Sequence, residues 1–340
     1  MTNEINETHL GGVCLVRTGG DSVTISWQPR RKDAQVKIFA GEDPDDMDRG
    51  KPVAAVRGAT EVSIAGLDPD TRYYFEVVPS DGPRLIISER RVQLEGGVNF
   101  RDLGGYRTVD GRRIKWGRIF RSDHLGRLTD RDVLLLQKMG IRLVCDFRTP
   151  AEIKKLPDRY PDNHPAKTLH LPVQHGESDP ANTFDRIKKG DIDWMTEEYM
   201  IKGYIKNIEN FAPMWARFFE SLAEPCNRPL VFHCTGGKDR AGMAAALILL
   251  ALGVPEETVI QDHGLSNLYI AAVLETIYDR IRDMGVDPDR ISVYFTAPPN
   301  AMPAVLAHLA AAYGSTANYL VKKAGIDKEL LTRLKNELLL

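Results

Sequence analysis

Hydrophobic and polar residues follow two different periods along the chain. From about Val13 to Gln93 apolar residues alternate with polar ones, as in the segments SVTISW, QVKIFAG, TEVSIAG, RYYFEVV and RLIISERRVQL. Clusters of Gly, Pro and Asp separate these segments, a pattern typical of short antiparallel strands joined by turns. The first part of the chain is therefore expected to form a small all-β sandwich.

After Gly96 the pattern changes to buried strands that alternate with helices. RLVCDF (142–147) and PLVFHC (229–234) are short apolar runs that lead into polar residues, as buried strands do. Helical periodicity covers six segments: Asp130–Met139, Thr196–Ala223, Ala241–Leu252, Pro255–Met284, Ala301–Tyr313 and Lys328–Leu340. This alternation predicts an α/β domain with helices on both faces of a central sheet.

The length of the chain agrees with a division into two domains. Its 340 residues exceed the roughly 100–200 that a single compact domain usually has. The sequence EGG, within residues 93–98, breaks the strand pattern. We therefore expect an all-β domain over residues 1–95 and an α/β domain over residues 96–340.

Composition and charge narrow the choice of partners and cofactors. A formal net charge of −2 provides no field that would attract nucleic acid or an anionic membrane. The longest apolar run, Ala244–Leu252, is too short to span a bilayer. The cysteines show neither paired nor metal-binding spacing, so we expect no disulfide framework, metal or cofactor: Cys14, Cys145, Cys226 and Cys234. The first residues do not resemble a signal peptide, so a cytoplasmic location is expected, with secretion after removal of a leader left open.

One segment, VFHCTGGKDRAG (231–242), concentrates reactive and charged residues between a predicted strand and a predicted helix. Unpaired amides at the start of a helix form an anion site. Gly236 and Gly237 are expected to adopt positive φ angles, which would let these amides converge on one centre. Arg240, just before the predicted helix, is suited to bind two oxygens of a phosphate.

Cys234 ends the predicted strand and is expected to face the same amides. The amides and Arg240 would favour its thiolate, which could attack a bound phosphate in line. No metal is required, because the guanidinium and the amides meet the charge of the transferred group. A Walker nucleotide loop is excluded, since Val231 and Asp239 stand where that motif has Gly and Ser or Thr. An ordinary turn around a buried cysteine is the alternative.

The segment HCTGGKDRAG (233–242) resembles the H-C-x-x-G-K-D-R-[ST]-G loop of bacterial tyrosine/lipid phosphatases. Four other segments resemble further motifs of that family: NFRDLGG (99–105), FRSDHL (120–125), LVCDFRTPAE (143–152) and DHGLSN (262–267). The resemblance extends over essentially all of residues 96–340. It implies a phosphatase with a protein-tyrosine-phosphatase-like fold and a phosphocysteine intermediate.

The family resemblance also implies roles for individual residues. Cys234 would be the nucleophile and Arg240 the phosphate clamp, with His233 supporting the loop. The remaining loop and helix residues would bind phosphate and substrate: Thr235, Gly236, Gly237, Lys238, Ala241 and Gly242. Lys238 would lie over the phosphate or point toward a second anionic group, unless it is simply solvated.

The leaving alcohol needs a proton from a nearby carboxylic acid. Asp239 is the first choice, because this family carries an aspartate inside the loop, although it could instead form an ion pair with Lys238 or Arg121. Asp146 is the second choice and Asp102 the third, and both could be purely structural.

The chain departs from the family pattern at Ala241, where Ser or Thr is usual. That hydroxyl normally donates to the departing cysteine sulfur, and its loss is expected to cost about 1.5–3 kcal/mol in the second step. Thr235 could substitute for it. The polar segment between Val173 and Trp194 is expected to be irregular and lies near the position of a lid in the family.

In the first part, LDPDTRYYFEV (67–77) contains the L-x-P-x-T-x-Y pattern and resembles fibronectin type III domains, with Trp27 on an early strand. The resemblance implies that Tyr73 ties a strand corner to nearby backbone. A β-sandwich of another family is the alternative.

The sequence as a whole predicts a cysteine-dependent phosphatase that acts on phosphomonoesters. Phosphotyrosine is the default substrate, and phosphoinositides or other small phosphorylated metabolites are the second option. Partners are therefore a phosphorylated protein, lipid or small molecule, and the sandwich would bind a protein or shape the pocket. A phosphate-binding pseudophosphatase is the alternative of another class.

Overall fold

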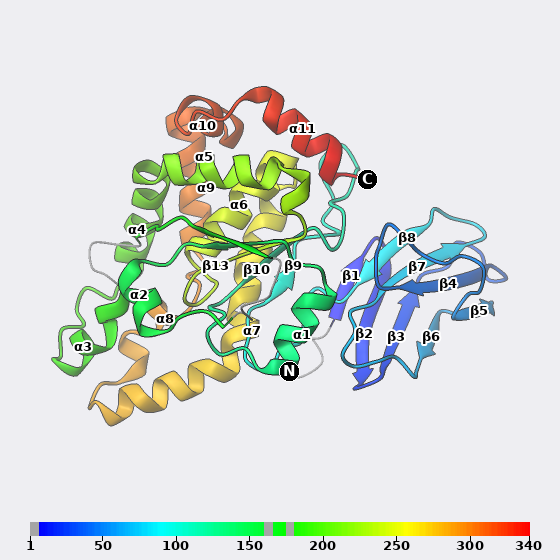
Figure 1. The fold of residues 1–340 in the computed structure, drawn as a ribbon, viewed down its shortest axis with the longest axis horizontal. Helices are drawn as coiled ribbons and strands as arrows, with labels where there is room; N and C mark the ends of the chain where they lie inside the picture. The colour runs from blue at the N-terminus through cyan, green and yellow to red at the C-terminus, as the bar shows by residue number, and fades with distance from the viewer. Residues whose placement is uncertain (1–6, 160–165, 175–179) are drawn as a thin grey trace.

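The computed structural model describes residues 7–159, 166–174 and 180–340, in which an all-β region precedes an α/β region (Figure 1). The all-β region contains two antiparallel four-stranded sheets, ordered β1-β2-β3-β6 and β5-β4-β7-β8. Its strands are β1 (Glu7–Leu10), β2 (Val13–Gly19), β3 (Ser22–Trp27), β4 (Gln35–Gly41), β5 (Ala54–Arg57), β6 (Glu61–Ile64), β7 (Tyr74–Pro79) and β8 (Leu85–Ser88).

The alternation of apolar residues explains how these two sheets pack. Ile25 of β3 and Ile38 of β4, one from each sheet, are fully buried in the same hydrophobic cluster. At the corner before β7, the Tyr73 hydroxyl accepts a 3.4 Å hydrogen bond from the amide of Asp68, the local backbone tie expected of this tyrosine.

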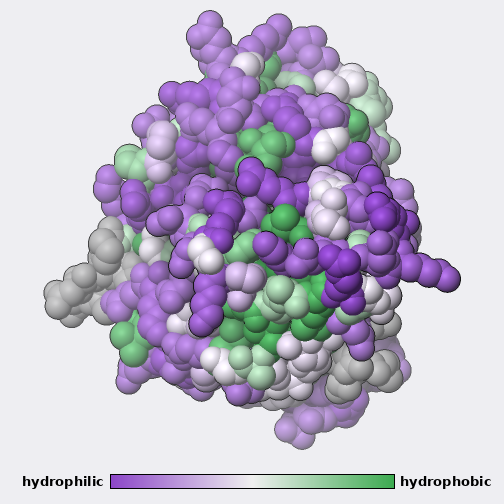
Figure 2. All heavy atoms as spheres, turned by 90° about the vertical axis from the view of Figure 1, so that its right-hand side faces the viewer, coloured by the Kyte–Doolittle hydropathy of each residue, from purple (hydrophilic) through white to green (hydrophobic). Residues whose placement is uncertain are grey.

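On the outer end of the region, hydrophilic residues surround a hydrophobic area (Figure 2).

A five-stranded sheet, ordered β12-β11-β13-β10-β9, organises the α/β region. Four of its strands are parallel, and β9 runs antiparallel to β10. The bounds are β9 (Arg101–Asp102), β10 (Ile119–Ser122), β11 (Leu143–Asp146), β12 (Lys167–His170) and β13 (Leu230–His233). The predicted strands correspond to β11 and β13, which lie side by side in the middle of the sheet.

Helices cover both faces of this sheet, as predicted (Figure 1). Val144 and Val231 pack with α1 on one face, whereas their neighbours Cys145 and Phe232 pack with α5 and α6 on the other. The helices are α1 (Asp130–Lys138), α2 (Pro150–Lys155), α3 (Thr183–Lys188), α4 (Glu197–Asn210), α5 (Ala212–Ala223), α6 (Arg240–Leu252), α7 (Glu256–Asp283), α8 (Ser292–Phe295), α9 (Ala301–Tyr313), α10 (Thr316–Lys322) and α11 (Lys328–Leu338).

Two predictions about these helices were wrong. The helix expected over 196–223 is two helices separated at Phe211, because Pro213 lies in the first turn of α5 and cannot continue the hydrogen bonding of α4. The segment expected to be irregular contains α3 and a 3₁₀ turn, Pro180–Asn182; its residues 175–179 lie outside the described residues. No helix in the described ranges is long and apolar enough to cross a membrane.

The two regions are joined by buried contacts rather than by a free linker. Trp116 of the α/β region is 2% exposed within the core of the all-β region, and its indole donates a 3.0 Å hydrogen bond to the carbonyl of Ile86. Arg72 forms a 3.0 Å ion pair with Asp102, and both side chains are buried. The amide of Asp102 also donates to the carbonyl of Arg90 at 2.9 Å. The connecting segment thus lies against the edge of the α/β sheet.

Candidate active site

The loop Cys234–Asp239, expected from the sequence to bind phosphate and called the phosphate loop below, connects β13 to α6 as predicted. Gly237 has a φ angle of +67°, and a Cβ atom there would lie 2.5 Å from the amide nitrogen of Asp123, so glycine is required. Gly236, expected to share a positive φ, does not adopt one. Instead its carbonyl accepts a 3.0 Å hydrogen bond from the side chain of Asn99, which fixes the loop from outside.

The loop opens into a cavity of about 400 Å³. Cys234 is 1% exposed at the end of β13, and the residues that follow it line the cavity: Thr235, Gly236, Lys238, Asp239 and Arg240. Ala241 and Gly242 are buried in the first turn of α6. The strand end thus places the sulfur immediately before the residues that face the cavity.

The rest of the cavity wall is mostly apolar, with two arginines and a smaller number of other polar side chains: Asp123, His124, Thr183, Thr276 and Tyr294. Arg127 and Arg280 are the cations, and the Arg280 guanidinium lies 4.2 Å from the centre of the Phe184 ring. The apolar side chains come mainly from α7 and the segments facing it: Ile270, Val273, Leu274, Ile277, Phe184 and Phe295. Such a wall suits an organic group attached to a phosphate better than a free ion.

Arg240 is held by a carboxylate that the sequence did not single out. Both of its terminal nitrogens donate to Glu152 of α2, each at 2.7 Å, and the Thr235 hydroxyl donates to the same carboxylate. Burial would raise the pKa of Glu152, but the Arg240 and Thr235 bonds outweigh it and lower the pKa to about 2. The guanidinium is therefore fixed in orientation beside the loop.

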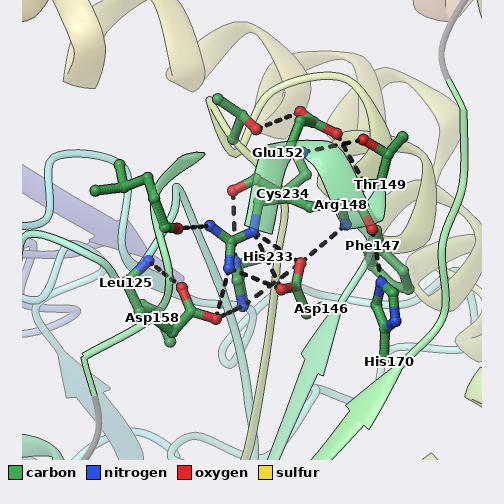
Figure 3. Close-up of polar contacts among 12 residues, drawn as sticks. Leu125, Asp146, Phe147, Arg148, Thr149, Glu152, Asp158, His170, His233 and Cys234 are labelled. Atoms are coloured by element: carbon green, nitrogen blue, oxygen red, sulfur yellow. Dashed lines mark hydrogen bonds and ion pairs between the residues drawn. The ribbon is translucent and has the colours of Figure 1, made fainter. Parts of the chain in front are cut away.

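A second group of charges, the His233 cluster, consists of His233, Asp146, Arg148 and Asp158 (Figure 3). His233 Nε2 lies 3.1 Å from Asp158, and Arg148 forms ion pairs of 2.7 Å with Asp146 and 2.8 Å with Asp158. Burial lowers the pKa of His233, but the neighbouring carboxylate of Asp158 outweighs burial and raises the pKa. The three ligand-type side chains are close enough for a metal site, yet Arg148 bridges both carboxylates.

Asp146, the second choice for the general acid, is committed to this cluster. Its carboxylate accepts from the backbone amide of Arg148 at 2.8 Å and from the guanidinium of the same residue. Its side chain is 4% exposed and does not line the cavity. The arrangement matches the structural role considered for it.

A third group, the Asp262 cluster, consists of Arg101, Arg121 and Asp262. Asp262 lies 2.5 Å from Arg121 and 3.2 Å from Arg101, and all three side chains are buried. Arg121 also donates a 2.7 Å hydrogen bond to the carbonyl of Gly237. Burial, followed by the charge of Arg101, lowers the pKa of Arg121 to about 10. Arg121, considered as a partner of Asp239, is thus a support of the loop.

Asp239 lies between a cation and a phenol. The Lys238 ammonium is 3.0 Å from its Oδ2, the ion pair considered from the sequence, and the Tyr204 hydroxyl is 2.7 Å from its Oδ1. Lys238 also donates to the carbonyls of Tyr294, at 2.7 Å, and Thr296, at 3.0 Å. Lys238 is therefore not solvated, because Asp239 and two carbonyls outside the loop hold its ammonium group.

Asp102, the third choice for the acid, faces the other region. Besides Arg72, it accepts from the amides of Gly104 and Gly117, each at 2.7 Å. Its side chain is fully buried and does not line the cavity, so its place is the junction between the regions.

Several residues at the site were missed by the sequence analysis, although parts of their segments were quoted. Glu152 ends LVCDFRTPAE, and Asp262 and His263 begin DHGLSN, so the motifs were visible but the contacts were not. Tyr204 had no distinguishing signal, because an aromatic residue on a helix is most often part of a core.

The α/β region of the chain matches a known protein family. A model of the tyrosine phosphatase family matches residues 92–340. The chain belongs to the tyrosine phosphatase family. It is a phosphatase, a hydrolase whose substrates carry phosphate groups.

Individual relatives are bacterial. A putative tyrosine-protein phosphatase of Cupriavidus necator is 30% identical over 229 residues, which cover 67% of this chain and 82% of the relative. The triple specificity protein phosphatase PtpB of Mycobacterium tuberculosis is 29% identical over 277 residues, covering 73% of this chain and 98% of the relative. Among solved structures, the core catalytic domain of the PP-IP phosphatase SIW14 from S. cerevisiae aligns with a TM-score of 0.31 and 14% identity, over 59% of this chain and 92% of that one.

Proposed function

We propose that the chain hydrolyses phosphomonoesters through a phosphocysteine at Cys234. The supporting observation is the arrangement of the loop: Cys234 begins it, Arg240 follows it, and Nε of Arg240 is buried with no hydrogen-bond partner among the described residues. A buried donor without an acceptor costs free energy. A phosphate oxygen would satisfy this donor while the loop amides bind the other oxygens.

The reaction proposed has two steps. In the first, the Cys234 thiolate attacks phosphorus, the S–P bond forms, and the P–O bond to the leaving group breaks while Asp239 gives that oxygen a proton. In the second, the Asp239 carboxylate takes a proton from water, whose oxygen attacks phosphorus; the S–P bond breaks and releases inorganic phosphate and the thiolate. Arg240 and the loop amides stabilise the charge in both.

The second step is proposed to be the slower one. Ala241 has no hydroxyl to offer the departing sulfur, and the Thr235 hydroxyl, the alternative donor, is bonded to Glu152. A missing hydrogen bond to a charged group corresponds to about 1.5–3 kcal/mol. The phosphocysteine should therefore accumulate during turnover.

Phosphotyrosine is the substrate that we propose first, because the apolar wall beside the loop suits an aromatic ring. Phosphoinositides and other small phosphorylated metabolites are the second proposal. Arg127 and Arg280 favour it, since they line the cavity where a further anionic group could reach them, whereas Lys238 is already bonded to two carbonyls. A binding-only pseudophosphatase is disfavoured by the presence of Cys234, Arg240 and Asp239 together, and only the missing hydroxyl at Ala241 favours it.

We further propose that residues 1–95 form a fibronectin type III-like domain and residues 96–340 the phosphatase domain. The tie between Tyr73 and Asp68 supports the first assignment. This domain would shape the pocket through the segment that follows it, because Gly96 and Val98 line the cavity. Its hydrophobic area in Figure 2 is a candidate surface for a protein partner.

The test is turnover of phosphotyrosine peptides, inositol phosphates and nucleotides, with and without a chelator. We expect metal-independent hydrolysis that is highest on phosphotyrosine and is lost in Cys234→Ser. Rapid-quench sampling should show a burst of alcohol before the steady rate. Full activity of Cys234→Ser, or abolition by the chelator, would refute the proposal.

A further inference from the structure

Two buried polar side chains, Tyr204 and His263, meet the half-buried Asp239 of the phosphate loop. The Tyr204 hydroxyl of α4 lies 2.7 Å from Asp239 Oδ1 and 2.9 Å from His263 Nε2 of α7. Tyr204 is 1% exposed and His263 is 3% exposed. Polar groups buried this deeply depend on one another for their hydrogen bonds.

The protonation states of the three side chains determine which group donates in each hydrogen bond. Burial, followed by the charge of Asp239, raises the pKa of Tyr204 well above its ordinary value, so the phenol keeps its one proton. Burial, followed by the charge of Arg121, lowers the pKa of His263 to about 3, so the imidazole is neutral. A carboxylate can only accept. Tyr204 therefore donates to Asp239, and its oxygen accepts from the Nε2–H of His263.

We propose that Tyr204 is a positioning residue that fixes Asp239 for proton transfer, and that His263 holds Tyr204 in place; this inference rests on the function proposed above. The phenol proton occupies Oδ1, so Oδ2 is the oxygen that carries a proton to the leaving group. Without this bond the carboxyl group could rotate and present either oxygen. Lys238 does not distinguish the two carboxylate oxygens of Asp239, because its ammonium nitrogen lies 3.1 Å from Oδ1 and 3.0 Å from Oδ2.

Gly242 makes room for this arrangement. A Cβ atom at this position would lie 3.0 Å from Cδ2 of His263, so a side chain on the first turn of α6 would displace the imidazole. The rings of His263 and Tyr204 meet edge to face with centres 5.6 Å apart, which orients the phenol toward the loop. A glycine expected to bind phosphate thus has a packing role toward α7.

The inference is tested with two esters whose leaving groups differ in basicity. A nitrophenolate leaves without a proton, whereas the phenolate of phenyl phosphate, like that of tyrosine, benefits from an acid. Tyr204→Phe should lower kcat/KM for phenyl phosphate by roughly tenfold, a part of the 10²–10⁴-fold that a general acid supplies, and for 4-nitrophenyl phosphate by less than about twofold. This parameter reports the first step, so slow breakdown of phosphocysteine does not mask the effect.

Two further variants separate positioning from a structural effect. Tyr319→Phe also removes a buried hydroxyl, one that donates to the carbonyl of Ile208 in α4 at 2.7 Å, and should leave the ratio of the two esters unchanged. In an Asp239→Asn background, Tyr204→Phe should no longer alter the ratio, because the group it positions is absent.

Each outcome decides between the claims. An equal loss on both esters, or a further change of the ratio in the Asp239→Asn background, would overturn the role of Tyr204 while Cys234-dependent turnover upheld the proposed function. Failure of the wild-type protein to hydrolyse either ester would overturn both.

Discussion

The His233 cluster and the Asp262 cluster both support the phosphate loop, but their charges balance differently. In the His233 cluster two carboxylates face Arg148 and a histidine, and the neighbouring Asp158 raises the pKa of that histidine despite burial. In the Asp262 cluster a single carboxylate faces two buried arginines. The His233 cluster is nearly neutral when His233 is protonated, whereas the Asp262 cluster carries an excess positive charge.

This difference indicates different tasks. A buried excess charge is unfavourable unless something compensates for it. Arg121 donates to the carbonyl of Gly237, so its charge lies next to the site where a phosphate would bind. We therefore interpret the His233 cluster as a support that is complete without substrate, and the Asp262 cluster as one that substrate completes.

Removal of the single carboxylate should have the largest effect. Asp262→Asn leaves Arg101 and Arg121 buried without a counter-charge, and should lower the free energy of unfolding by about 3–5 kcal/mol. Urea unfolding measures this value. Asp279→Asn is the matched control on α7, since its pair with Arg282 is exposed and its loss should stay within about 0.5 kcal/mol. Similar small losses of unfolding free energy in both variants would show that the two buried arginines do not depend on the Asp262 carboxylate for charge compensation.

A smaller, pH-dependent loss is expected in the other cluster. Asp158→Asn should lower the free energy of unfolding by about 1.5–3 kcal/mol, because it removes the charged partner of His233. The raised pKa of His233 means that its contribution is complete below its ordinary value of 6.5 and is lost as the pH rises through the raised value. The pKa of Asp158 is lowered, since the bond to His233 outweighs burial, so its contribution is complete above the ordinary 3.8 and is lost as the pH falls through the lowered value.

Wild type and Asp158→Asn should therefore differ most between about pH 4 and 6.5 and less at pH 9. Urea unfolding at pH 5.5 and pH 9 tests this order. A difference that grows toward pH 9 would contradict the assignment of a protonated His233.

The smallest effect concerns ligand binding. Arg121→Lys keeps a charge but cannot bond Asp262 and the Gly237 carbonyl with one planar group, so inorganic phosphate should bind roughly tenfold more weakly, or ~1.4 kcal/mol. Arg148→Lys, in the balanced cluster, should change the dissociation constant by less than about threefold. Titration calorimetry with inorganic phosphate gives both constants. Equal weakening would remove the distinction between the clusters.

Local sequence was sufficient for some of these features and not for others. Cys234 and Arg240 belong to one strand–loop–helix unit, so their spacing alone predicts that they share a site. Glu152 lies 88 residues from Arg240, and Tyr204 lies 35 residues from Asp239, so their contacts depend on how separate elements pack. Gly236 and Gly237 look equivalent in sequence, and only the folded structure shows that Gly237 has the positive φ and lies against the amide of Asp123.

The helix periodicity shows the same limit. Apolar spacing continues through Phe211, so the pattern predicted one helix, whereas a second helix begins at Ala212 with Pro213 in its first turn. The candidates for the general acid show a similar limit. Asp146 and Asp102 have the carboxyl group that a general acid needs, but their ion pairs with Arg148 and Arg72 became evident only in the folded structure.

The burial of Trp116 in the core of the all-β region affects how the molecule can be divided. A side chain from one region fills the interior of the other, so neither interior is complete in isolation. Both should lose their structure in one cooperative transition, seen as a single heat-capacity peak. An unrelated module that replaced the β region would have to supply a cavity for this indole and a counter-ion for Asp102. The two segments of the gene are therefore expected to evolve as one unit.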